Sequence, residues 1–295
     1  MADMRVGIIG GSGLGQALSG QQGAQPVDIE TPFGPPSSPI LQTRWEDVEL
    51  ALLARHGEGH RFNPSAVPYR ANIYALKSLG ATHIIASGAV GSLRDDICPR
   101  DLVIPDQVID KTSRRDSTFF DAGLVAHVEF AEPFCPVLRQ VLIDAAADTE
   151  ATVHDRGTYV CMEGPQFSSR AESHMHRQWG GDLIGMTCMP EAKLAREAEI
   201  AYALVALPTD YDCWRAHQPG ASKQELLAEI IGNLQAATEN AMQLIRAALR
   251  RIRNNPPPPS PAHNALELAI WSDKSSIDPA VVKRLGPLVA RYFQN

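Results

Sequence analysis

Short apolar runs rich in β-branched residues alternate with longer helical patterns along most of the chain, up to about residue 253. The runs predict strands at residues 6–9, 50–54, 83–87, 101–104, 157–162, 183–186 and 201–207. The patterns between them predict helices at residues 65–79, 136–147, 168–179 and 190–199. This alternation is typical of α/β domains. We therefore predict one α/β domain over residues 1–253, with a central mixed sheet flanked by helices.

The end of the chain follows a different pattern. The last long helical pattern opens with Ser222 and Glu225 in capping-box spacing. Residues 254–263 include the run NNPPPPSP, which predicts an extended Pro-rich spacer. In the tail at 264–295, Asp278 and Pro279 predict the start of a short amphipathic helix carrying apolar residues as far as Phe293. Because so short a helix is not stable alone, we expect it to dock on its own domain or on a neighbouring subunit.

The overall charge excludes several classes of partner. A net charge of -7 argues against nucleic acid and anionic membranes, which both recruit basic proteins. No run approaches the roughly 20 apolar residues that span a bilayer, and the N-terminus lacks the pattern of a signal peptide.

The five cysteines form no CxxC pair, which suits reduced thiols in a cytoplasm. We expect no metal, because the pairs His56/His60 and His174/His176 lack a third ligand nearby.

The first predicted strand runs into a glycine loop, GIIGGSGLG, in which Ser12 lies between Gly11 and Gly13. The backbone amides of such a loop can surround an anion. A dinucleotide fold is the obvious alternative. Its fingerprint fails, however, since neither G-x-G pair is followed three residues later by Gly or Ala. A glycine-rich turn without a ligand also remains open.

Two further strand ends carry residues suited to binding an anion. Arg55 and His56 directly follow the run at 50–54, where open α/β sheets bind ligands. Thr187 follows the run at 183–186, so its hydroxyl can reach an anion. An ordinary surface pair and an ordinary helix N-cap are the respective alternatives.

A carboxylate pair and an aromatic residue complete the candidates. Asp210 and Asp212 close the run at 201–207, and strand alternation predicts that they point the same way. Carboxylates that close repel as anions, so we expect one to keep its proton near neutral pH, as an acid catalyst requires. Turn or N-cap acids are the alternative. Phe167 follows the Gly-Pro turn of EGPQFSSRAE and is suited to stacking on a flat base or to filling the core.

Taken in order, these motifs resemble the trimeric purine nucleoside phosphorylase family, most closely its 5'-methylthioadenosine phosphorylase branch. The resemblance spans about residues 5 to 250. It rests on the stretches GIIGGSGL, TPFGPPS, LLARHGEGHRFNPSAVPYRANIYALKSLGATHII, GSLR, AEPFCP, EGPQFSSRAES, GMTCMPEAKLAREAEIAYA and TDYDCW.

The resemblance implies roles for individual residues. The phosphate site it implies consists of Ser12, Arg55, His56, Ser87, Gly88 and Thr187. The nucleoside site it implies consists of Ala89, Phe167, Met186, Asp210, Asp212 and, from an adjacent subunit, His127. Asp210 would face purine N7 and Asp212 the 6-amino group, both as catalytic residues. One departure stands out: the branch usually has a Thr pair before Ala89, so Gly88 removes a hydroxyl expected near phosphate and ribose.

The function implied is phosphorolysis of 5'-methylthioadenosine to adenine and 5-methylthioribose 1-phosphate, in methionine and purine salvage. Inorganic phosphate is the co-substrate, with no metal or organic cofactor. The family also implies a cytoplasmic homotrimer, with a dimer of trimers left open. The first alternative is a phosphorylase of 6-oxopurine nucleosides such as inosine, guanosine or methylthioinosine, against which Asp210 argues because that branch generally carries Asn there. The second is a non-catalytic nucleotide-binding module.

Overall fold

The computed structural model describes residues 4–15, 23–215 and 222–293. Within these residues eleven strands form one mixed sheet. The strands are β1 (Arg5–Gly10), β2 (Gln25–Val27), β3 (Ile40–Trp45), β4 (Val48–Ala54), β5 (Ala81–Ser92), β6 (Leu102–Val103), β7 (Gln107–Asp110), β8 (Val153–His154), β9 (Thr158–Cys161), β10 (Leu183–Gly185) and β11 (Ala201–Asp210). The α-helices are α2 (Tyr69–Ser78), α3 (Pro136–Ala145), α4 (Arg170–Gln178), α5 (Cys188–Glu197), α6 (Lys223–Asn254) and α7 (Pro279–Leu285). The predicted α/β domain with a mixed sheet is confirmed.

Strand β5 is the centre of the sheet. It pairs in parallel with β1 and β11, and its last residues pair antiparallel with β10. It continues well past the predicted end at residue 87, because β11 runs alongside it as far as Asp210. On the other side of β1, the order continues through β4 and β3 to β2, and both β3–β4 and β2–β3 are antiparallel. Among the described residues, the first strand after the glycine loop is β2, which lies at the edge of the sheet and pairs antiparallel with β3, whereas a dinucleotide-binding unit continues with a strand parallel to the first.

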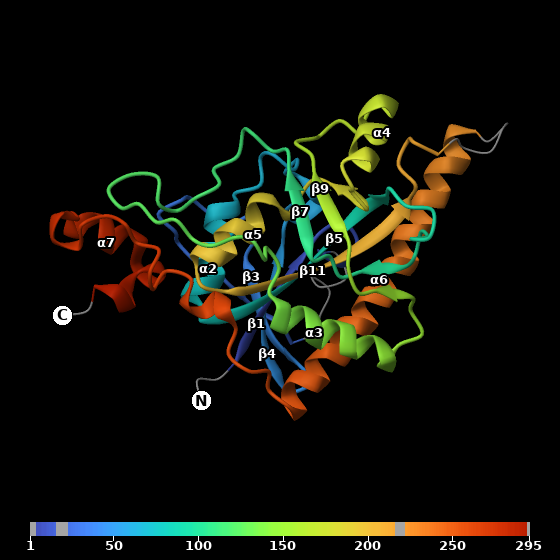
Figure 1. Cartoon of the computed structure of the whole chain (residues 1–295). Coiled ribbons are helices and arrows are strands. Elements are labelled where there is room, and N and C mark those ends of the chain that lie inside the picture. The colour runs from blue at the N-terminus through green and yellow to red at the C-terminus, as the bar shows by residue number, and fades with distance from the viewer. Residues whose placement is uncertain (1–3, 16–22, 216–221, 294–295) are drawn as a thin grey trace.

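The sheet is covered on both faces (Figure 1). Helices α3 and α6 pack on one face, where Val6 and Ile8 of β1 contribute to the same buried cluster. Helices α2 and α5 pack on the other face, where Ile9 of β1 is buried. Because neighbouring side chains of a strand point to opposite faces, one short apolar run supplies both cores. The strand ends between these layers carry the candidate site.

The C-terminal segment packs on the same domain. Ser222 and Glu225 form the predicted capping box of α6, and Asp278 accepts a hydrogen bond from the Ala280 amide at 2.8 Å at the start of α7. Helix α7 is shorter than predicted, because the chain turns at Gly286 with φ +48°. Beyond it, residues including Leu288 are buried in the cluster that contains α2, so the tail docks on its own domain. No helix in the described part of the chain is long and apolar enough to cross a membrane.

Candidate active site

The glycine loop after β1 brings its backbone against two other segments. A Cβ atom on Gly11 would lie 2.7 Å from Arg55 Nη1 and 2.7 Å from the Ser87 carbonyl oxygen, so only glycine fits there. Gly13 has φ +86°, a conformation that favours glycine. Ser12 stands between them at the wall of a cavity of about 330 Å³ that is also lined by His56. The loop, the end of β4 and the middle of β5 therefore meet at one place.

Arg55 is completely buried, which sequence reasoning did not foresee. Its Nε and Nη2 donate to the Glu191 carboxylate at 2.7 and 2.8 Å, and its Nη1 donates to the Ser87 carbonyl at 2.8 Å. Tyr202 donates to the same carboxylate at 2.8 Å. Burial by itself would lower the pKa of Arg55, but contact with Glu191 outweighs it and raises the pKa. Arg55 is thus a permanently charged group with a fixed orientation below the glycine loop.

Glu191 and Tyr202 were both missed as partners of this site. Glu191 lies in the first turn of α5, directly after the GMTCMP stretch, and Tyr202 is the second residue of β11. In the sequence alone, a glutamate next to a proline at the start of a helix looks like any acidic residue that stabilises a first helical turn. Only the approach of α5 to the end of β4 shows that Glu191 forms an ion pair with Arg55.

His56 contributes a neutral ring. Its Nδ1 lies 2.8 Å from the Phe62 carbonyl oxygen, so that nitrogen carries the proton and Nε2 is the acceptor. The ring stacks on His60 at 4.1 Å between centroids. Burial and the neighbouring Arg55 charge lower the pKa of His56 to about 4. At neutral pH the imidazole therefore offers a lone pair, while the positive charge at this site comes from Arg55.

The turn between β10 and α5 supplies a hydroxyl on the opposite side. Thr187 occupies the N-cap position of α5, but its hydroxyl makes no capping hydrogen bond. The hydroxyl oxygen lies 3.3 Å from the position that a Cβ on Gly88 would take. Among the described residues the buried Ser87 hydroxyl also has no hydrogen-bond partner. The Thr187 hydroxyl and the Ser87 hydroxyl therefore lie close to the residues that contact the Arg55 guanidinium, an arrangement that suits a small anion.

The two aspartates lie together, but by a turn and not by strand alternation. Strand β11 ends at Asp210, and Asp212 has φ +50°. The Asp212 amide donates to Asp210 Oδ1 at 2.7 Å, and the Thr209 hydroxyl donates to Oδ2 at 2.8 Å. Burial raises the pKa of Asp212, and the charge of Asp210 raises it further. Of the two carboxyls, Asp212 is therefore the one whose surroundings favour the protonated form, while Asp210 accepts two hydrogen bonds.

Gly91 of β5 sets the place of both carboxylates. A Cβ atom there would lie 3.3 Å from Asp210 Oδ1, 3.2 Å from Asp212 Cβ and only 2.9 Å from Cγ2 of Ile184. Gly91 and Gly88 are on the same strand, three residues apart, a span of about 10 Å at the usual rise of an extended chain. The anion-binding groups and the carboxylates thus stand at two points along one strand.

The remaining predicted residues lie in different surroundings. Met186 is half-buried, and its Sδ would lie 2.6 Å from a Cβ on Gly164, so the side chain rests on the Gly-Pro turn. Ala89 is half-buried on β5 between Gly88 and Gly91. Phe167 is 85% exposed, so the alternative that it fills the core is wrong.

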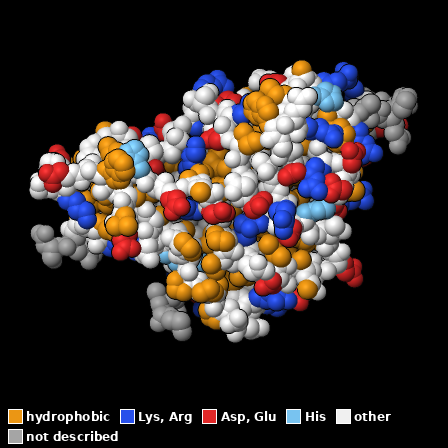
Figure 2. Space-filling view, viewed as in Figure 1, with side chains coloured by type: hydrophobic (Ala, Val, Ile, Leu, Met, Phe, Trp, Pro, Cys, Tyr) orange, Lys and Arg blue, Asp and Glu red, His pale blue; other side chains and the backbone are white. Residues whose placement is uncertain are grey.

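His127 lies apart from these groups, on the loop covered by the C-terminal tail. Its amide donates to the Ala269 carbonyl at 2.9 Å, and its ring meets Trp271 edge-on at 4.8 Å. Trp271 and Leu268 are strongly exposed, at 74% and 91%. Figure 2 shows hydrophobic side chains and a histidine gathered on the lobe that carries α7. Within the described residues no group of three or more His, Cys, Asp or Glu could hold a metal ion.

The fold and this two-part site define a phosphorylase. The family model of the phosphorylase superfamily matches residues 5–250, and the chain belongs to this superfamily. An S-methyl-5'-thioadenosine phosphorylase from Thermosynechococcus vestitus is 47% identical over 98% of this chain and 99% of its own. One from Chloroflexus aurantiacus is 47% identical over 99% of this chain and all of its own. These matches extend through the Pro-rich segment and the tail.

Solved structures agree with these relatives. A methylthioadenosine phosphorylase from an antarctic soil metagenomic library has a TM-score of 0.88, with 47% identity over 98% of this chain and 99% of that one. A methylthioadenosine phosphorylase from Schistosoma mansoni, solved in complex with adenine, has a TM-score of 0.78, with 36% identity over 85% of this chain and 93% of that one.

Proposed function

We propose that this chain is a pentosyltransferase that cleaves 5'-methylthioadenosine with inorganic phosphate, giving adenine and 5-methylthioribose 1-phosphate. The observation that carries this proposal is the pair of sites along β5. The fixed cation Arg55 contacts Ser87, whose hydroxyl has no partner among the described residues, and the Thr187 hydroxyl lies beside Gly88. Two carboxylates lie beside Gly91. The names of the relatives favour the 6-aminopurine nucleoside over inosine or guanosine.

At the anion end, phosphate is bound by Arg55, the glycine-loop amides with Ser12, and the hydroxyls of Ser87 and Thr187. Arg55 keeps its charge because Glu191 holds it, and two of its N–H groups remain for a ligand. The neutral His56 ring accepts a hydrogen bond from a protonated phosphate oxygen. These contacts place the nucleophile below C1' of the sugar and stabilise the developing ribosyl cation.

At the base end, Asp210 faces purine N7 and Asp212 the 6-amino group. Departure of adenine leaves negative charge on the ring, and a proton or strong hydrogen bond at N7 neutralises it. The C1'–N9 bond breaks as phosphate oxygen bonds to C1', through an oxocarbenium-like ribosyl group. Met186 and Ala89 contact the sugar, and Phe167 covers the purine. No metal or organic cofactor takes part in this scheme.

The proposal extends to assembly and setting. In a homotrimer, His127 of one subunit contacts the 5' end of the nucleoside that is bound in the neighbouring subunit. This role accounts for the position of His127 beside exposed Trp271 and Leu268, away from the other site residues. The enzyme works in the cytoplasm, in methionine and purine salvage. Gel filtration with light scattering tests the trimer, and a monomeric, fully active protein would exclude it.

The test of the function is a phosphate-dependent base-release assay. Methylthioadenosine, adenosine, inosine and methylthioinosine are compared at equal concentration, with and without phosphate. We expect methylthioadenosine to be cleaved fastest and only when phosphate is present. Faster cleavage of inosine would place the enzyme among 6-oxopurine phosphorylases, and base release without phosphate would make it a hydrolase.

The glycine at position 91 provides a prediction about the base end. In Gly91→Ala the new methyl group meets the side chains of Ile184, Asp210 and Asp212, so the carboxylates must move by some tenths of an ångström. We expect kcat/KM for methylthioadenosine to fall by about tenfold or more, since small displacements of reacting groups are costly. The KM for phosphate should change little. Gly232→Ala is the control, because a Cβ there meets nothing within 4 Å.

A further inference from the structure

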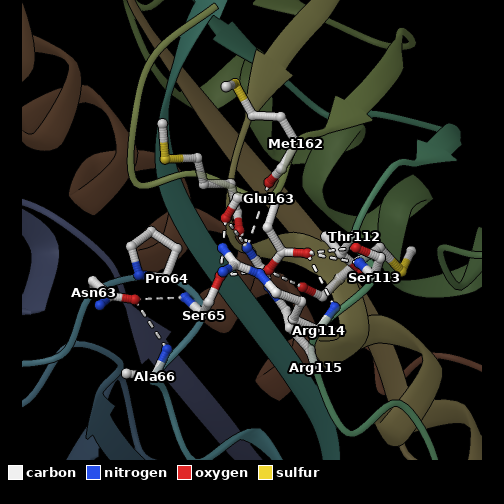
Figure 3. A network of polar contacts seen from close by, with 12 residues as sticks. Asn63, Pro64, Ser65, Ala66, Thr112, Ser113, Arg114, Arg115, Met162 and Glu163 are labelled. Carbon is white, nitrogen blue, oxygen red and sulfur yellow. Dashed lines mark hydrogen bonds and ion pairs between the residues drawn. The ribbon is translucent and has the colours of Figure 1, made fainter.

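One arginine outside the proposed binding groups holds both loops that carry them. Arg115 follows β7, and its side chain is only 1% exposed. Its Nη1 donates to the carbonyl oxygens of Met186 at 2.6 Å and Met189 at 2.5 Å. Its Nη2 donates to the Glu163 carbonyl at 2.6 Å and lies 3.4 Å from that of Met162. Figure 3 shows this guanidinium between the segments around Met162 and Ser65.

The Glu163 side chain completes the arrangement from the other side. Its carboxylate accepts from Arg115 Nε at 3.1 Å, from the Ser65 hydroxyl at 2.5 Å and from the Ser113 and Arg114 amides at 2.6 and 3.2 Å. Burial opposes ionisation, but these donors outweigh it and lower the pKa of Glu163 to about 2. The carboxylate therefore stays charged at neutral pH and fixes the loop from which Arg115 projects.

The contacts of Arg115 are with the backbone next to two proposed ligand-binding side chains. The Met186 carbonyl belongs to the peptide bond that leads into Thr187, so a donor on that oxygen fixes both residues. Gly164 follows Glu163, and the Met186 side chain rests on it. Met186 is thus held through its carbonyl by Arg115 and through its side chain by the Glu163 loop.

We infer that Arg115, clamped by Glu163, is a positioning residue that sets the sugar contact of Met186 and the phosphate contact of Thr187 together, without touching either ligand. The kinetic part of this inference rests on the proposed function. A lysine cannot replace it, because an ammonium has three donors and no planar fork, whereas this guanidinium serves four carbonyls and a carboxylate.

A purely structural role predicts a different outcome, and Arg139 on α3 is the matched control. Its guanidinium also binds main-chain carbonyls, those of Pro105 at 2.9 Å, Ile104 at 3.3 Å and Asp155 at 2.5 Å. Arg115→Gln and Arg139→Gln therefore both remove carbonyl-binding contacts. Only the first removes them beside Met186 and Thr187.

We expect Arg115→Gln to lower kcat/KM for phosphate-dependent methylthioadenosine cleavage by about 100-fold, the effect of displacing reactive groups by about 1 Å. The KM for phosphate should rise as well, and low-millimolar guanidinium should restore part of the rate. Arg139→Gln should keep the kinetics of the unmodified enzyme and gain nothing from guanidinium. Equal kinetics of both variants, or loss of activity in Arg115→Gln without any guanidinium rescue, would overturn the inference.

A second measurement does not depend on catalysis. With methyl-labelled methionine, the Met186 resonance should shift in Arg115→Gln and remain unchanged in Arg139→Gln, while Met242 on α6 stays in place in both. An unmoved Met186 signal would overturn the inference even if methylthioadenosine proves not to be the substrate. If Arg115→Gln does not fold, Glu163→Gln should give a smaller change of the same kind, since it puts an amide opposite the Ser113 and Arg114 amides. An unchanged Met186 signal and unchanged kinetics in that variant would also overturn it.

Discussion

Replacing Arg55 by methionine should weaken phosphate binding and destabilise the fold, by separable routes. The variant leaves the Glu191 carboxylate buried without its cation, and breaking such a pair typically costs about 3–5 kcal/mol. It also removes a charge-assisted hydrogen bond to phosphate, worth about 1.5–3 kcal/mol, so the KM for phosphate should rise by about 10-fold to 100-fold. Urea denaturation measures the first effect and initial rates at varied phosphate the second.

The double variant Arg55→Met/Glu191→Gln separates the two effects. The glutamine is neutral and can still accept the hydrogen bond from Tyr202, so much of the lost free energy of unfolding should return. The KM for phosphate should stay high, because no cation is restored. Recovery of both quantities would show that Arg55 holds the fold together and takes no part in binding phosphate.

Asp210→Asn should be the most damaging change at the base end. The present carboxylate uses one oxygen for the Asp212 amide and the other for the Thr209 hydroxyl. Asparagine has a single acceptor oxygen and carries no transferable proton, so one of these contacts and the proton at N7 are lost together. We expect turnover of methylthioadenosine to fall by about 10²-fold or more, the usual contribution of a general acid. Activity on inosine relative to methylthioadenosine should rise.

Asp212→Asn is the comparison for that experiment. The pKa of Asp212 is raised by burial and by the neighbouring Asp210 charge, so Asp212 is the rival proton donor. Steady-state rates of both variants on both nucleosides identify the donor. A near-normal rate in Asp210→Asn with a large loss in Asp212→Asn would reverse the two roles.

Much of the secondary structure could be predicted from the amino-acid sequence. Periodicity located the cores of β1, β4, β9 and β10, and the helix starts at Ser222 and Asp278 were recognisable because capping chemistry is local. Strands β2, β3, β7 and β8 were not predicted. They are short or half-exposed, and neighbouring strands supply the hydrogen bonds that keep them extended.

For the candidate site, the sequence predicted the residue types but not their arrangement in space. The glycine loop, the Arg-His pair and the aspartates were visible as residue types at strand ends. Their spatial relation was not: the aspartates share a turn, and Asp212 adopts φ +50°. The partners Glu191, Tyr202 and Arg115 gave no local signal, since each acts on a segment far away in sequence.

The amino-acid sequence alone determined the α/β class and the strand ends that carry chemistry, because strand periodicity, helix capping and glycine conformations depend on near neighbours in the chain. Its ordered motifs also carried the resemblance to nucleoside phosphorylases. Only the tertiary structure decided that Arg55 is buried on Glu191, that His56 is neutral and that Arg115 holds two loops at once. Those properties depend on burial and on charges brought together across the sheet, and desolvation acts on the folded molecule as a whole.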